Sequence, residues 1–136
     1  MKIQLVIAGA LALMVIGSPT ATAQGKFDRA HTGQELASYA TLWERTRAEG
    51  GVISGIENAR NIEYFLGFVT GVAAATTNVS WCPPRDPPIM VGQAWGIAAK
   101  YLREHPENWH LPADHLVQLG LSQAFPCPPK TKKPSR

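Results

Sequence analysis

The sequence is poor in cysteine and lacks the short motifs of common enzyme classes. Its two cysteines, Cys82 and Cys127, form no Cys-x-x-Cys or Cys-x-x-Cys-His pattern, which excludes a dithiol redox centre and a c-type haem site. No GxGxxG, P-loop, HExxH, EF-hand or GxSxG motif is present. We therefore predict a protein that is not an enzyme and that binds no cofactor.

A metal site is not expected either. His105, His110 and His115 lie five residues apart and are separated by prolines. This spacing differs from the i, i+4 pattern that places two imidazoles on one helical face. Surface or capping roles are the simpler interpretation of these histidines.

Positive charge is scarce within the body of the chain. The formal net charge of +3 arises from Lys2 at one end and from four basic residues after position 129 at the other. Without these five, eight basic residues remain against ten acidic ones. A nucleic-acid-binding face needs Lys and Arg clustered on a folded surface, so we expect no nucleic-acid partner. Residues 130–136 form a basic Pro/Lys tail that we expect to be disordered.

Only one long apolar run occurs, at residues 5–16, and it is too short to span about 30 Å of hydrocarbon. It follows Lys2 and precedes Ala21-Thr-Ala23, the pattern of a cleaved secretory signal peptide over residues 1–23. The mature chain is then exported and has no membrane span. In an oxidising compartment the two cysteines predict one disulfide, Cys82–Cys127, which stabilises the fold by about 4 kcal/mol on the chain-entropy model.

Strand-like alternation is absent, and residues 24–129 predict a small all-α domain with four helices and one disulfide. A capping box at Thr32 and Glu35 begins the first helix, and Gly50 and Gly51 end it. The others are expected at about residues 57–77, at 91–104, and from 113 to just before Phe125. Their apolar positions predict this core: Leu36, Tyr39, Ala40, Trp43, Ile62, Phe65, Leu66, Val69, Val72, Ala73, Val91, Ala94, Trp95, Ala98, Tyr101, Leu102, Ala113, Leu116, Val117, Gly120, Leu121 and Ala124.

The helix at 57–77 is apolar almost all round, because Tyr64, Phe68 and Gly71 lie opposite its main apolar stripe. Such a helix is either central to the core or covered on its second side by a partner chain. Gly67 and Gly71 lie four residues apart and would let another backbone approach closely. We therefore expect Tyr64, Gly67, Phe68 and Gly71 to serve helix packing or a homodimer interface.

An ordered series of short segments resembles the Rap/Tai-type immunity proteins of type VI secretion, over roughly residues 32–128. The stretch from Phe65 to Gly71 is similar to their GYxxG helix. The other matching segments are Trp81-Cys-Pro83, Gln93, Lys100-Tyr-Leu-Arg-Glu-His-Pro106, His110-Leu-Pro-Ala113 and Phe125-Pro-Cys127.

The resemblance implies a small helical periplasmic protein, often dimeric, that binds and blocks a peptidoglycan amidase delivered by neighbouring cells. Many relatives carry further cysteines in the first helix and just before the GYxxG segment. This sequence has Ser38-Tyr39 and Tyr64-Phe65 in those regions. Apolar packing by Tyr39 and Phe65 is one replacement for such a bridge.

An inhibitor of this kind needs a preordered element that fills the groove of the enzyme. The turn after the third helix combines acidic and aromatic side chains, the mixture typical of binding hot spots. The stiff Pro-rich loop at residues 81–88 is the second candidate, because ordering it on binding costs little. Core packing is the alternative interpretation of Trp81 and Trp109. The candidate contact residues are Glu104, His105, Glu107, Asn108 and Trp109 in the turn, and Arg85 and Asp86 in the loop.

Two other functions fit the same residues. A small periplasmic stress chaperone also uses a helical dimer with one disulfide, and it opens when acid protonates the carboxylates at its interface. A domain of this fold without any toxin partner is the third possibility, because folds are reused.

Overall fold

The computed structural model describes residues 32–129, and over this range the chain forms four α-helices. They are α1 (Gly33–Ala48), α2 (Ile56–Thr76), α3 (Val91–Glu104) and α4 (Ala113–Ala124), with a short 3₁₀ turn, η1 (Pro106–Asn108), before α4. The β-pairing within the described range consists of isolated bridges. The predicted all-α fold is thus confirmed. The predicted signal peptide at 1–23 and the basic tail at 130–136 lie outside the described residues.

Local sequence signals set the ends of the helices. The Thr32 hydroxyl accepts a hydrogen bond from the Glu35 amide, while the Glu35 carboxylate accepts one from the Thr32 amide, as the predicted capping box requires. After α1 the chain turns through Gly50 and Gly51, which have φ angles of 94° and 82°. These left-handed values favour glycine, so the α1–α2 connection begins where the two glycines predicted it.

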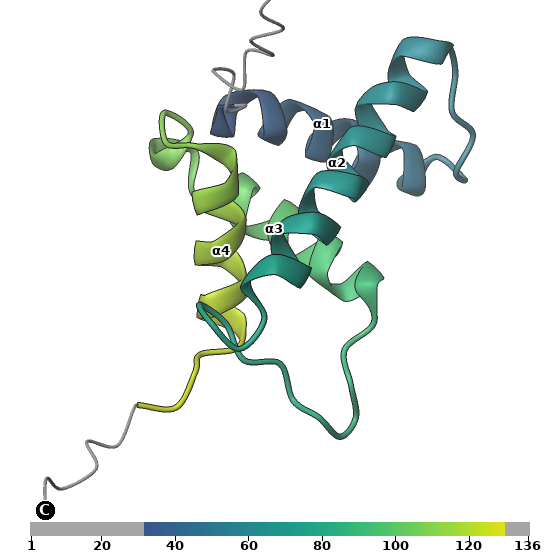
Figure 1. The fold of residues 1–136 in the computed structure, drawn as a ribbon. Helices are drawn as coiled ribbons and strands as arrows, with labels where there is room; N and C mark the ends of the chain where they lie inside the picture. Colours follow the sequence, from purple (N-terminus) through teal and green to yellow (C-terminus); the bar gives the residue numbers. More distant parts are fainter. Residues whose placement is uncertain (1–31, 130–136) are drawn as a thin grey trace, which may run out of the picture.

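The four helices surround one core, and every pair of helices is in contact. Figure 1 shows α2 crossing in front of α3, with α1 and α4 on two sides of this pair. On each helix the side that faces the core is buried, and its apolar positions recur every three or four residues. The largest fully buried side chains are Phe65, Leu36, Leu102, Leu116, Leu121, Val69 and Val117.

The prediction that Val91 and Ala124 are buried is wrong. Val91 is 48% exposed because it is the first residue of α3, and Ala124 is exposed because it is the last residue of α4. Residues at these helix ends lie beyond the region that the neighbouring helices cover. Several other predicted core residues pack against the core but stay half-buried: Tyr39, Leu66, Val72, Trp95 and Tyr101.

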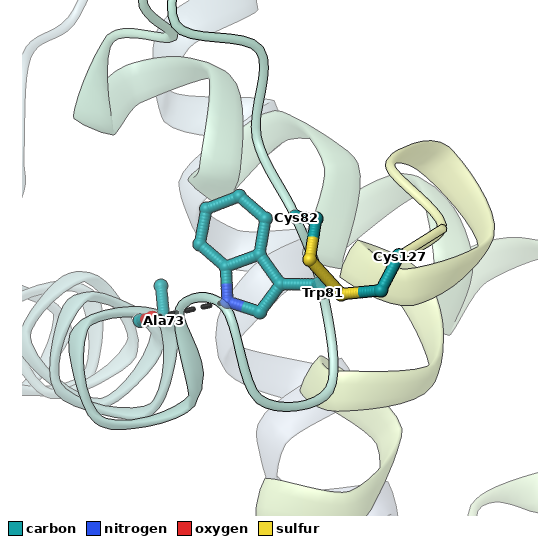
Figure 2. Close-up of a disulfide and its surroundings, with 4 residues drawn as sticks. All are labelled: Ala73, Trp81, Cys82 and Cys127. Carbon is teal, nitrogen blue, oxygen red and sulfur yellow. Dashed lines mark hydrogen bonds between the residues drawn. A yellow bond between two sulfur atoms is a disulfide. The ribbon is translucent and has the colours of Figure 1, made fainter. Parts of the chain in front are cut away.

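The predicted disulfide between Cys82 and Cys127 is confirmed, and it joins the segment after α2 to the segment after α4 (Figure 2). The Cys82 amide also donates to the Phe125 carbonyl at 2.9 Å. Next to the disulfide, Trp81 is 3% exposed and its indole Nε1 donates to the Ala73 carbonyl at the end of α2. Core packing therefore accounts for Trp81.

Candidate protein-binding site

The connection between α3 and α4 is a rigid corner, which we define as residues 104–110. Pro106 occupies the first position of η1, where its missing amide hydrogen costs no hydrogen bond. The Gln34 amide donates to the Trp109 carbonyl at 3.0 Å, and the Gly33 amide donates to the Leu111 carbonyl at 2.9 Å. These bonds fix the corner to the first turn of α1.

The outer side of the corner carries acidic side chains. Glu104 and Glu107 are exposed. The Glu107 carboxylate lies 3.0 Å from His105 Nδ1, and this hydrogen bond lowers the pKa of Glu107 below its ordinary value. The His105 ring in turn packs on Tyr101, with ring centroids 4.3 Å apart. The contact with His105 therefore favours the charged form of Glu107.

The inner side of the corner is bonded to the body of the domain. Trp109 is half-buried and its Nε1 donates to the Leu102 carbonyl at 2.8 Å. Asn108 Nδ2 lies 3.4 Å from the Tyr101 hydroxyl and donates to it. Of the five predicted contact residues in the corner, Glu104 and Glu107 are therefore the ones that face solvent, and His105 positions Glu107.

A shallow cavity of 270 Å³ lies beside the corner, between α3 and α4. Its lining includes Tyr101, Glu104 and Gly120. Gly120 lets α4 lie close to α3 here, because a Cβ at this position would be only 2.8 Å from Tyr101 Cβ. The corner thus combines an exposed carboxylate with a neighbouring recess that can accept a side chain.

The Pro-rich loop lies at the other end of α3. Arg85 and Asp86 are exposed, in the segment that hangs at the bottom of Figure 1, whereas the corner lies at the upper left. α3 has 14 residues and is therefore about 21 Å long. The structure does not bring the two predicted contact segments together, so a partner that touches both must span the length of α3.

A family comparison decides the class of this helical domain. The family model of the Rap1a immunity proteins matches residues 32–127. The chain belongs to the Rap1a immunity protein family. The match covers α1 to α4, both cysteines and both predicted contact segments, and it confirms the resemblance found in the sequence. No curated protein gives a significant match.

On this Rap1a-family domain, the four residues of the predicted packing or dimer group separate into two kinds. Tyr64 and Phe68 are half-buried; their rings stack at 5.6 Å, and Tyr64 also meets Tyr39 of α1 edge-on. Gly67 and Gly71 are exposed, and a Cβ at either would meet nothing within 4 Å. Apart from their own helix, no described residue approaches these glycines closely, so packing within the described range does not account for them.

Two further properties concern residues 32–129 of this family member. No group of three or more His, Cys, Asp and Glu side chains there could hold a metal ion. No helix in the same range combines the length and apolar character needed to cross a membrane.

The sequence did not predict a second cavity, of 350 Å³, lined by Trp43, Arg47, Gly92 and Trp95. It lies between the end of α1 and the start of α3. Its one signal in the sequence is the i, i+4 spacing of Trp43 and Arg47, which places a cation on the face of an indole. The contribution of Gly92 and Trp95 depends on how α1 and α3 pack.

Proposed function

We propose that this protein is a periplasmic immunity protein that binds and inhibits a peptidoglycan amidase effector of a type VI secretion system. The match to the Rap1a immunity proteins over the whole helical domain is the observation that carries this proposal. Export follows from the predicted signal peptide at residues 1–23. Peptidoglycan amidases act in the periplasm, so the inhibitor must be there as well.

Inhibition requires no chemistry from the immunity protein. The corner at residues 104–110 enters the substrate groove of the amidase and keeps the peptide stem out. Glu104 and Glu107 make charge-assisted hydrogen bonds to donors of the enzyme. Because hydrogen bonds to α1 and to Leu102 already fix the corner, little conformational entropy is lost on binding. A side chain of the enzyme occupies the recess beside Tyr101.

The proposal includes a homodimer of the immunity protein. A homodimer that pairs the exposed Gly67 and Gly71 faces of two α2 helices would present two corners. The Pro-rich loop with Arg85 and Asp86 then contacts the enzyme outside the groove, because it lies at the far end of α3.

The test is to search the neighbouring reading frames for a peptidoglycan amidase, to co-express it with the protein, and to measure co-purification and hydrolysis of purified peptidoglycan. We expect a stable complex and loss of hydrolysis. Replacing both corner carboxylates, Glu104→Gln with Glu107→Gln, should weaken inhibition by about a hundredfold, at roughly tenfold per charge-assisted bond. The matched control is Glu57→Gln, an exposed carboxylate in the first turn of α2. Full inhibition by the double variant would contradict the role of the corner, and no binding by the wild type would contradict the function.

The chaperone alternative is tested by acidification of the purified protein. Dissociation of an oligomer in acid, together with new binding of unfolded client proteins, would contradict the immunity proposal. We expect that acidification produces no client binding, because the corner carboxylates described above are exposed to solvent on the single chain.

A further inference from the structure

The cavity between α1 and α3 lies apart from the corner. Two indoles form its apolar walls, Trp43 and Trp95, whose ring centroids lie 6.5 Å apart at an angle of 82°. Gly92 leaves the mouth open, because a Cβ there would meet only Trp95, at 3.9 Å. The cavity adjoins the N-terminal end of α3, whereas the corner follows its C-terminal end.

The indole N–H of Trp43, a residue of the cavity lining, has no acceptor among residues 32–129. Three of the four tryptophans donate their indole N–H to an acceptor within the domain: Trp81 to Ala73, Trp95 to Leu66 and Thr70, and Trp109 to Leu102. Trp43 is only 7% exposed, yet its Nε1 has no hydrogen-bond partner among residues 32–129. In that range, Ser80 Oγ is the one side-chain polar atom that is both enclosed and without a hydrogen-bond partner. Trp43 Nε1 is therefore not enclosed and keeps contact with solvent.

The charge at the cavity is also unbalanced. The Arg47 guanidinium lies over the Trp43 ring, 4.9 Å from its centroid. Arg47 is in no ion pair within the described residues, and the cavity lining contains no carboxylate. The nearby Glu44 is paired with Arg103 instead. A guanidinium without an ion pair, beside the indole rings of an apolar cavity, fits a carboxylate that is attached to an apolar group.

The surroundings of the cavity favour a protein as the source of that carboxylate. Met90 and Val91, directly before Gly92, are 70% and 48% exposed. Large apolar side chains exposed beside a cavity are typical of protein-contact surfaces.

We propose that the Trp43–Arg47–Gly92–Trp95 cavity binds a segment of a partner protein in which an apolar side chain lies next to a carboxylate. The apolar side chain packs against the two indoles at the mouth of the cavity, and the carboxylate accepts hydrogen bonds from Arg47 and from Trp43 Nε1. Met90 and Val91 cover the flanking part of the segment. This binding does not depend on the amidase, because the cavity adjoins the N-terminal end of α3 and the corner follows its C-terminal end.

The test uses the exported chain with ¹⁵N-labelled indoles, titrated with the peptide acetyl-Leu-Glu-Leu-amide and with its Gln counterpart. We expect the Trp43 Nε1–H signal, assigned with Trp43→Phe, to shift and saturate, while the signals of Trp81 and Trp109 stay in place. The Glu peptide should bind about tenfold more tightly than the Gln peptide, the effect of one charge-assisted hydrogen bond.

Two variants and one control sharpen this test. Arg47→Gln should remove the preference for the Glu peptide, and Gly92→Phe should fill the cavity and abolish binding of both peptides. Arg45→Gln, an exposed arginine of the same helix turn outside the cavity lining, should change nothing. Absence of a Trp43 shift, equal affinity for the two peptides, or equally tight binding of sodium acetate would each overturn the proposal. The last result would show a site for small anions.

Discussion

At the scale of the residue, Gly120 marks a close approach between α3 and α4. A Cβ at this position would lie 2.8 Å from Tyr101 Cβ and 3.1 Å from Tyr101 Cγ, too near for either atom to move without shifting α3. We expect Gly120→Ala to destabilise the domain by about 1–3 kcal/mol, the usual cost of overpacking. Thermal unfolding measured by circular dichroism checks this value.

Gly96 provides the matched control for this substitution. It also lies within a helix, but a Cβ there would meet nothing within 4 Å. Gly96→Ala should therefore stabilise the protein by about 0.5–1 kcal/mol, because alanine loses less backbone entropy on folding. Equal effects of the two substitutions would show that α3 and α4 do not approach as described.

Glu107 is the residue whose titration reports on the corner. Its hydrogen bond with His105 lowers the pKa of the carboxyl group below the ordinary 4.5. The lowered pKa means that the contact stabilises the folded state above the unfolded-state pKa, and that this contribution disappears as the pH falls through the folded-state pKa. A ¹³C NMR titration should place the Glu107 midpoint below 4.5, and His105→Ala should raise it. The same midpoint in both proteins would exclude the contact.

At the scale of the element, the disulfide determines how α4 is held against the segment before α3. It joins residues 45 positions apart. In the chain-entropy model, closing a loop of this length raises the free energy of unfolding by about 4 kcal/mol. Reduction should lower the melting temperature of the wild type strongly. The double variant Cys82→Ser with Cys127→Ser should melt at that lower temperature with or without reductant. An unchanged melting temperature on reduction would contradict the predicted contribution.

At the scale of the whole molecule, α2 connects the fold to its proposed oligomer. Gly71→Leu is a clean test, because a side chain there meets nothing within 4 Å in the same chain and leucine favours a helix more than glycine does. We expect an unchanged or higher melting temperature together with a shift from dimer to monomer in light scattering. Ser38→Leu, at an exposed position of α1, is the control that should keep the dimer. A wild type that is monomeric at high concentration would exclude this interface.

The sequence predicted the bounds of the helices well, but it predicted less well which of their side chains are buried. The bounds of α3 agree with the prediction, and those of α2 differ by one residue at each end. In both cases the signals are local: a change of hydrophobic period, Pro-rich segments and glycines. Val91 and Ala124 were assigned to the core from their helical phase alone. Phase gives the direction of a side chain, but a neighbouring helix must extend far enough to cover it.

The sequence by itself determined the all-α class, the capping box of α1, the disulfide partners and the family resemblance, because each depends on spacing along the chain or on there being only two cysteines. The tertiary structure alone decided that the corner and the Pro-rich loop lie at opposite ends of α3. It also decided that Gly67 and Gly71 face outward and that Trp43 and Arg47 meet Gly92 and Trp95 at one cavity. These features arise from packing between residues far apart in the sequence, which helical periodicity does not specify.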